Sequence, residues 1–228
     1  MIRIFAKYTG SFAGGFAARL IICLAGVLLN VVITILFYRI PLYMDTIMTV
    51  AVTFLCGLPW GVLCGVLTSI TGHTLWFWSW LAYLFTLCSI ATAIITWLFI
   101  RFFPGALTVV IEGESKTQTI AFRSSYLNRI MDRVVALILL SFALCIAMSI
   151  LGGLISVFIQ FINNAYTDDP NRFAFLGRVL FDENSPVILV EIMSRIPVNI
   201  VDRLIAAFAG FGIALGFHSL LQRLTIKV

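Results

Sequence analysis

The residues of this chain that could do chemistry are a few ionisable and polar side chains at the edges of strongly apolar stretches. Arg195, Asn199 and Asp202 stand at i, i+4 and i+7, on one face of a helix, and Glu191 can pair with Arg195 four residues later. A charge at mid-membrane costs about 2.5 to 3.5 kcal/mol on insertion scales. Two interpretations stay open: a structural ion pair at the interface, with Arg203 extending to water, or a ligand site.

A second group of polar side chains lies at the ends of neighbouring apolar stretches. Tyr43 and Asp45 enter one stretch, and His73 and Trp76 close another. An acid, a hydroxyl, an imidazole and aromatic faces on one rim would suit a small, flat, polar ligand. Tryptophan is also a common bilayer anchor, and a single histidine is often an ordinary interfacial residue. The candidate substrate-binding residues are Tyr43, Asp45, His73, Trp76, Asn163, Glu191, Arg195, Asn199 and Asp202.

Catalytic and metal-binding motifs are missing from the sequence. It contains no HExxH, GxSxG, P-loop or GxGxxG motif, and its five cysteines form no CxxC spacing. The two histidines, His73 and His218, belong at opposite membrane faces. We therefore expect no catalytic residue, no metal site and no cofactor, and transport driven by ATP would need a partner. An intramembrane enzyme is kept only as a third hypothesis.

The elements that must position these residues are membrane helices. Of the 228 residues 61% are hydrophobic and 11% charged, against about 25% charged in ordinary soluble domains. Apolar runs of about 20 residues can cross a hydrocarbon core about 30 Å thick, and a helix satisfies its own backbone there. This composition excludes a soluble globular protein. The basic residues flank the apolar runs instead of sharing one polar face, which argues against nucleic acid as a partner.

The apolar runs predict one all-α membrane domain over residues 1–228, a polytopic bundle of six transmembrane helices. The predicted spans are 18–38, 42–58, 61–78, 81–103, 134–162 and 198–221. Strong turn chemistry at Gly57-Leu58-Pro59-Trp60-Gly61 separates the second span from the third. Both spans are near the minimum length of about 17 residues, so the alternative is a re-entrant hairpin that leaves four crossings.

The distribution of charge predicts that both termini are cytoplasmic. Ten of the fifteen lysines and arginines lie near the N-terminus, in the loop after the fourth span or near the C-terminus. Such an excess marks the cytoplasmic side. The outer loop 163–195 includes a stretch, 171–181, in which arginines alternate with apolar residues. A short amphipathic helix there could form a lid over a cavity, or lie in the interface without a gating role.

Small residues at helical spacing predict places where helices approach closely. Three such stripes are Gly10, Gly14 and Ala18, then Gly57, Gly61 and Gly65, then Ala206, Gly210 and Ala214. Each stripe has two interpretations, packing within the molecule or docking of a partner membrane subunit. Gly14 and Ala18 are the candidate docking residues because their stripe begins at the cytoplasmic border.

Three stretches resemble a known family. The runs PLYMDTI at 41–47 and GLPWGVLCGVLT at 57–68 resemble the early spans of the substrate-binding S components of energy-coupling factor (ECF) transporters. The run IPVNIVDRL at 196–204 resembles the start of their final helix. The predicted helices, the chain length and the cytoplasmic termini agree with this resemblance over nearly the whole chain.

The resemblance implies a subunit that captures a vitamin or similar micronutrient outside the cytoplasmic membrane of a bacterium or archaeon. Such a subunit docks onto a transmembrane coupling subunit that carries two ATPases. The residues that would hold the ligand are Tyr43 and Asp45 from the first loop, His73 and Trp76 from the third, and Asn199 and Asp202 from the last helix.

The first helix departs from the family pattern. In that family alanine-rich small spacing of the first helix contacts the coupling subunit, whereas here the spacing is built from Gly14 and Ala18 and is poor in alanine further along. A second hypothesis, from a different class, is a membrane sensor or scaffold protein with the same helical fold, which signals through protein contacts.

Overall fold

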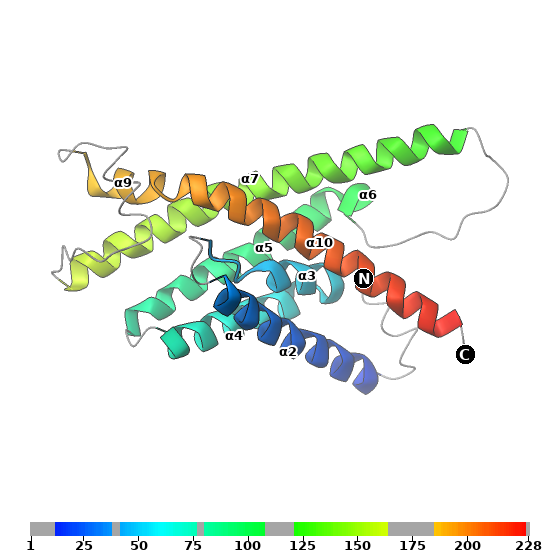
Figure 1. Cartoon of the computed structure of the whole chain (residues 1–228), viewed down its shortest axis with the longest axis horizontal. Coiled ribbons are helices and arrows are strands. Elements are labelled where there is room, and N and C mark those ends of the chain that lie inside the picture. The colour runs from blue at the N-terminus through cyan, green and yellow to red at the C-terminus, as the bar shows by residue number, and fades with distance from the viewer. Residues whose placement is uncertain (1–11, 38–41, 77–79, 108–120, 164–184, 227–228) are drawn as a thin grey trace.

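The structure, a computed structural model, describes residues 12–37, 42–76, 80–107, 121–163 and 185–226 (Figure 1). Over these residues every regular element is helical, which confirms the predicted all-α class. The elements are α2 (Phe12–Leu36), α3 (Ile47–Cys56), α4 (Leu58–Trp76), the 3-10 helix η1 (Trp80–Phe85), α5 (Thr86–Phe102), α6 (Pro104–Leu107), α7 (Ala121–Asn163), α9 (Val187–Met193) and α10 (Ile196–Ile226).

Four helical stretches in these ranges are long and apolar enough to cross a membrane. They are Gly15–Leu36, Trp80–Phe102, Ile130–Ile162 and Val187–Leu220. The shortest has 22 residues, which gives it a length of about 33 Å against a hydrocarbon core of about 30 Å. The chain therefore has the elements of a multi-pass membrane protein. Six crossings and cytoplasmic termini stay predictions.

The predicted second and third spans form a hairpin of two unequal helices. With ten residues α3 is about 15 Å long, and with 19 residues α4 is about 28 Å long. Gly57 joins them with a φ of 91°, a left-handed conformation that favours glycine. The short arm therefore covers about half of a hydrocarbon core, and the predicted span 42–58 is helical only over Ile47–Cys56.

Contacts with α10 keep residues 42–46 out of the helix. The backbone N–H of Met44 donates to the Asp202 carboxylate at 2.9 Å, across 158 residues of sequence, and Met44 has a φ of 51°. An irregular backbone inside a membrane protein is tolerated where protein buries it and satisfies its polar groups. Met44 is 7% exposed and meets this condition. The segment therefore replaces a turn of helix with a tertiary contact.

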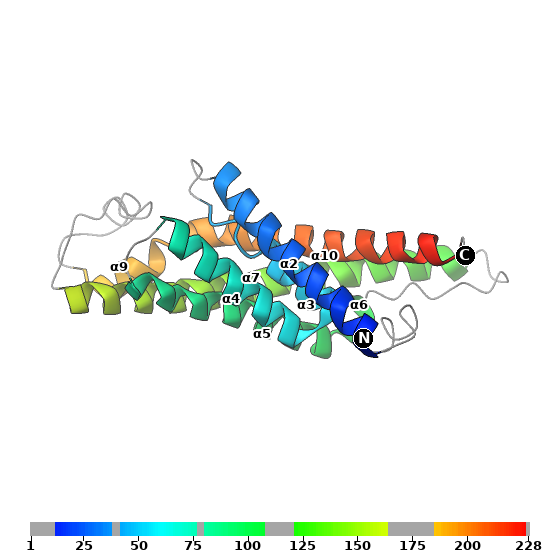
Figure 2. The same cartoon turned by 90° about the horizontal axis from the view of Figure 1, so that it is seen from below.

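The main helices run alternately toward one end of the molecule and the other. In chain order these are α2, α3, α4, α5, α7 and α10 (Figure 1). The first residues of α2, the first residues of α7 and the last residues of α10 lie toward one end, and α9 lies at the opposite end (Figure 2). Two helices, α7 with 43 residues and α10 with 31, extend beyond the shorter ones.

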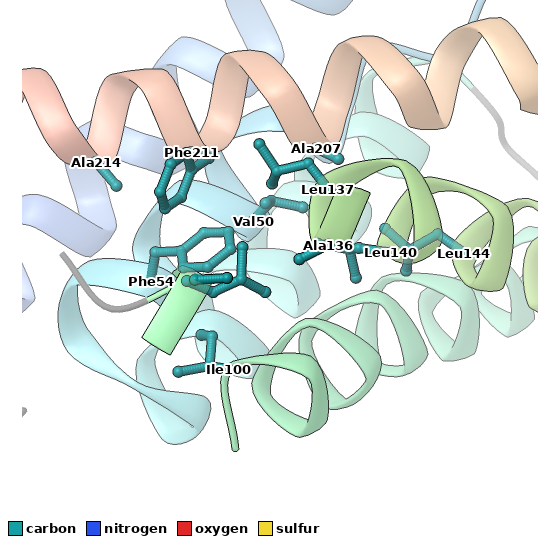
Figure 3. Close-up of a cluster of buried hydrophobic side chains, with 12 residues drawn as sticks. Val50, Phe54, Ile100, Ala136, Leu137, Leu140, Leu144, Ala207, Phe211 and Ala214 are labelled. Atoms are coloured by element: carbon teal, nitrogen blue, oxygen red, sulfur yellow. The ribbon is translucent and has the colours of Figure 1, made fainter. Parts of the chain in front are cut away.

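The apolar core is built around α3, in which eight of the ten residues are buried. The rings of Phe54 on α3 and Phe211 on α10 meet edge to face, with their centroids 5.1 Å apart (Figure 3). Side chains of α5, α6 and α7 complete this cluster. Its buried members are Val50, Phe54, Ile100, Ala106, Leu107, Ala136, Leu137, Leu140, Leu144, Ala207, Phe211 and Ala214.

Glycines allow the neighbouring helices to approach α3 closely. A Cβ atom added at Gly210 of α10 would lie 2.9 Å from the Ile47 carbonyl oxygen. One added at Gly65 of α4 would lie 3.2 Å from Thr49, and one at Gly26 of α2 would lie 3.1 Å from Val52. The second and third stripes of small residues therefore serve packing within the molecule.

Candidate functional site

Residues 42–46 lie along the polar face of α10. Their contacts with it form one connected site, which we call the polar network. The hydroxyl of Tyr43 accepts a hydrogen bond from Arg195 Nη1 at 3.0 Å. The hydroxyl of Thr46 accepts one from Arg203 Nη1 at 2.6 Å. Together with the bond from Met44 to Asp202, these contacts anchor the non-helical segment to α10 and to Arg195, which lies in the turn just before it.

Arg195 contacts this segment, α7 and α9 at once. Its Nη2 donates to Ser156 of α7 at 2.6 Å and forms a 3.2 Å ion pair with Glu191 of α9. The other oxygen of Glu191 accepts from Gln160 of α7 at 2.8 Å. The guanidinium packs against Gly152 of α7, where an added Cβ would lie 3.5 Å from Arg195 Nη1, an ordinary van der Waals distance. The predicted pairing of Glu191 with Arg195 is therefore confirmed.

Asn199 and Asp202 lie on the same face of α10, as their spacing predicts. Asn199 is 2% exposed, and its Nδ2 donates to Ser149 of α7 at 2.9 Å. Asp202 is 1% exposed, and its second oxygen lies 2.9 Å from Arg203 Nη2. An ion pair this deeply buried makes a strong Coulomb interaction, although both groups lose their hydration.

The expectation that Arg203 extends to water is wrong. Arg203 is 4% exposed and contacts Thr46 and Asp202. The reason is its register, because a residue eight positions after Arg195 is turned by about 80° on the helix and stays within the apolar stripe about 100° wide that faces the bundle.

Several polar atoms of the network are buried without a hydrogen-bond partner among the described residues. They include the acceptors Oδ1 of Asp45 and Oδ1 of Asn199 and the donor Nε of Arg203. Buried polar groups are nearly always paired, so each exception needs an explanation. The charges that act on Asp45 through space are the Arg203 guanidinium and the Asp202 carboxylate. Asp45 itself is only partly buried as a residue, which places it at the accessible edge of the network.

Several residues of the network were not among the sequence candidates. Thr46, Arg203 and three residues of α7 were missed. Ser149, Ser156 and Gln160 repeat on α7 at i, i+7 and i+11, together with Gly152 at i+3, which is one helical face. A search of the fifth predicted span for a polar stripe would have found them. Thr46 follows Asp45 at the start of the same apolar stretch, but its role depends on contact with α10.

Among the described residues, the ring neighbours of His73 are aromatic residues of η1 and not the residues of the polar network. Its ring lies 5.9 Å from the ring of Tyr83 and 6.4 Å from that of Phe85, both in η1. The hydroxyl of Thr74 next to it lies 3.0 Å from that of Tyr83. These contacts fix the end of α4 against η1, whereas the polar network is built from residues 42–46, α7, α9 and α10.

The remaining candidates fall wholly or partly outside the described residues. Trp76 ends α4 and Asn163 ends α7, and the side chains of both lie outside the description, as does the expected amphipathic helix at 171–181. The last part of the predicted loop 163–195 is helical, because α9 covers Val187–Met193. Of the docking candidates, Ala18 is half-buried on α2, and the surroundings of Gly14 lie outside the description.

A second buried polar centre joins α2, α3 and α4. Asn30 of α2 is fully buried, and its Nδ2 lies 3.4 Å from the Thr49 hydroxyl and 3.3 Å from the Thr68 hydroxyl. Its Oδ1 accepts from the backbone N–H of Met48 at 2.9 Å. This amide is fully hydrogen-bonded, so it acts as a structural clamp, in contrast to the polar network.

The polar network is closed by its own side chains. Arg195, Asn199, Asp202 and Arg203 are each at most 4% exposed. A cavity of about 10 Å³, the size of one water molecule, lies further along α7 and α10. Its lining residues are Ser141, Phe142, Cys145, Ile200 and Leu204. A ligand larger than water would therefore have to separate Tyr43 from Arg195, or the segment 42–46 from α10.

Family models, curated proteins and solved structures were compared with the chain, and none of them matches it.

Proposed function

We propose that the chain is the substrate-capture subunit of an ECF-type importer. In this proposal it binds a vitamin or similar small micronutrient at its extracytoplasmic side, and it has both termini in the cytoplasm of a bacterium or archaeon. A transmembrane coupling subunit and two ATPase subunits supply the energy. The observation that carries the proposal is the polar network, in which buried atoms of Asp45, Asn199 and Arg203 have no hydrogen-bond partner among the described residues.

The energetics of the network support a binding role. Each ionised group in a membrane helix costs several kcal/mol unless it is paired, and replacing buried ion pairs by apolar residues is often neutral or stabilising. A network retained only for stability would be expected to satisfy all its atoms, as Asn30 does. Unpaired donors and acceptors beside ion pairs are the usual composition of a site that completes its hydrogen bonds with a ligand.

The location of the network also supports this role. Tyr43 and Asp45 come from the segment before α3, and Asn199 and Asp202 from α10, the same parts of the chain that the resemblance to S components names. Binding would be coupled to movement, because the closed network must open first. Opening at the Tyr43 to Arg195 hydrogen bond would leave the Arg195–Glu191 and Arg203–Asp202 ion pairs intact.

The experiment that tests the proposal is native mass spectrometry of the protein purified in mild detergent from cells grown in rich medium. We expect one bound small molecule per chain, and we expect affinity capture from the source membrane to recover a coupling subunit and two ATPases. Asn199→Leu should lose the bound molecule, while Thr34→Val, which changes a hydroxyl bonded only to the carbonyl one turn earlier in α2, should keep it. Protein that carries no small molecule and captures no ATPase would refute the proposal.

The lengths of α7 and α10 favour the sensor or scaffold as a second candidate. At 43 and 31 residues they measure about 65 and 47 Å, longer than a hydrocarbon core of about 30 Å. Their long ends lie toward the same end of the molecule (Figures 1 and 2). Such projections could pass a movement to a regulator in the cytoplasm. Capture of a kinase or another regulator in place of ATPases would favour this function.

A further inference from the structure

The charges of the polar network do not balance. Its described side chains include two arginines, Arg195 and Arg203, and three acids, Asp45, Glu191 and Asp202. Arg195 pairs with Glu191 at 3.2 Å, and Arg203 pairs with Asp202 at 2.9 Å. Asp45 is the acid left over, and it has no ion pair within the described part of the chain. The network therefore carries one surplus carboxylate.

Two of the unsatisfied atoms match the surplus carboxylate, whereas Nε of Arg203 is an unsatisfied donor. Oδ1 of Asp45 and Oδ1 of Asn199 are both acceptors, and both are buried without a donor from the described residues. Asn199 is 98% buried, because only 2% of its surface is exposed. It stands on α10 four residues after Arg195 and three before Asp202, so it faces the same space as the network. The surplus carboxylate and these two acceptors would be matched by a positively charged group that donates hydrogen bonds.

The residues on both sides of Asp45 are anchored to α10, so the Asp45 carboxylate is pre-positioned. Met44 is bonded to Asp202 and Thr46 to Arg203, at 2.9 and 2.6 Å. Asp45 lies between these two anchors and is partly buried, whereas Asp202 is 1% exposed. A carboxylate held in place by its neighbours binds a cation with little loss of conformational entropy.

We propose that the ligand of the polar network is a small organic cation with an N–H donor group, such as a primary ammonium, whose charge is balanced by Asp45 and whose N–H bonds to Asn199 Oδ1. This inference rests on the proposed function and narrows its substrate class. The cation enters the polar network when Tyr43 separates from Arg195. Asp202, Glu191 and both arginines keep their pairs when the cation is bound.

The test compares two probes that differ in this group alone. Pyridoxamine carries an aminomethyl group that is protonated at neutral pH, and pyridoxine carries a hydroxymethyl group at the same position. Thiamine serves as a second cationic probe and pantothenate as an anionic one. Affinity is measured by isothermal titration calorimetry on the intact protein in detergent, after removal of any bound molecule. We expect a cationic probe to bind, with pyridoxamine at least tenfold tighter than pyridoxine.

The variants separate the role of Asp45 from that of charge in general. Asp45→Asn should remove the preference for pyridoxamine. Asp132→Asn makes the same chemical change at an exposed position near the other end of α7, and it should leave the preference unchanged. The comparison of the two probes in the unchanged protein needs no variant, so a variant that fails to fold does not decide the matter.

Each remaining outcome overturns the inference. These outcomes are equal binding of the two matched probes, tighter binding of pantothenate, a preference that survives in Asp45→Asn, and no binding of any cationic probe. Binding of pantothenate or pyridoxine would leave the substrate-capture function standing. The mass spectrometry and capture experiments described above test that function separately.

Discussion

At the scale of single residues, the difference between a paired and an unpaired buried group decides what each side chain does. Asp202 satisfies the N–H of Met44 with one oxygen and pairs with Arg203 through the other. Asn30 uses all of its hydrogen-bonding capacity. Asp45 and Asn199 do not. The first two residues are therefore expected to govern stability, and the last two to govern binding.

The first prediction concerns Asp202→Ala. The substitution leaves the Arg203 guanidinium buried without its counter-ion and the N–H of Met44 without an acceptor. Removal of one partner from a buried ion pair costs about 3 to 5 kcal/mol. Thermal or denaturant unfolding in detergent should show a loss of this size. Asp132→Ala, at an exposed site on α7, should change stability by no more than about 0.5 kcal/mol, and equal losses in the two variants would contradict the assignment.

The second prediction concerns the clamp between α2, α3 and α4. Asn30→Leu removes the acceptor for the N–H of Met48, which lies in the first turn of α3 and has no carbonyl within its own helix. An unsatisfied buried donor costs about 1 to 3 kcal/mol, so the free energy of unfolding should fall by that amount. Thr34→Val, one turn later on the same helix, should cause little change, because its hydroxyl bonds only to the Asn30 carbonyl. A larger loss in Thr34→Val would refute the role of Asn30.

At the scale of elements, α3 is the helix against which the others pack, and two glycines of α10 provide a matched test. A Cβ at Gly210 would lie 2.8 Å from Val50 and 2.9 Å from the Ile47 carbonyl, whereas one at Gly212 would meet nothing within 4 Å. Overpacking costs about 1 to 3 kcal/mol, and an unobstructed Gly to Ala change in a helix gains up to about 1 kcal/mol. Gly210→Ala should therefore lower the melting temperature, and Gly212→Ala should keep or raise it. The reverse order would show that α10 does not pack on α3 in this way.

Much of the element structure could be predicted from sequence, because long apolar runs report membrane helices directly. The predicted spans 18–38, 81–103 and 134–162 each fall largely on a helix of the structure. The length of α3 could not be predicted in this way. Its N-terminal end depends on a hydrogen bond between Met44 and Asp202, and hydropathy over a short window contains no information about a partner 158 residues away.

The same distinction between local and long-range information applies to the prediction of the candidate site. Spacing correctly placed Asn199 and Asp202 on one face of α10 and paired Glu191 with Arg195, although Arg195 lies in the turn just before α10 and not on the helix itself. It could not decide whether Arg203 faces lipid, water or protein, because that depends on which helices surround α10. It also could not assign His73, whose aromatic neighbours in η1 come from a turn of the chain with no periodic pattern.

At the scale of the whole molecule, the unequal hairpin places the polar network inside the bundle and away from its surface. The long arm α4 measures about 28 Å and the short arm α3 about 15 Å, and both start from the turn at Gly57. The two arms run in opposite directions, so the segment 42–46 joins α3 at a level about 13 Å short of the Trp76 end of α4 (Figure 1). Non-helical backbone at that depth is expected only where it is covered by protein or lines a site.

Labelling of the turn in this hairpin distinguishes six crossings from a re-entrant hairpin. If α4 crosses the bilayer, the turn at Gly57 lies at the cytoplasmic surface, and the exposed Pro59 beside it can be labelled from that side. In a variant without the five native cysteines, we expect Pro59→Cys to react with a membrane-impermeant maleimide in inside-out vesicles only. Pro186→Cys, at the start of α9 and toward the opposite end of the molecule, should react in right-side-out vesicles only. Protection of Pro59→Cys in both preparations would mean that the hairpin turns within the membrane, and the network would then lie closer to the outer surface than α4 suggests.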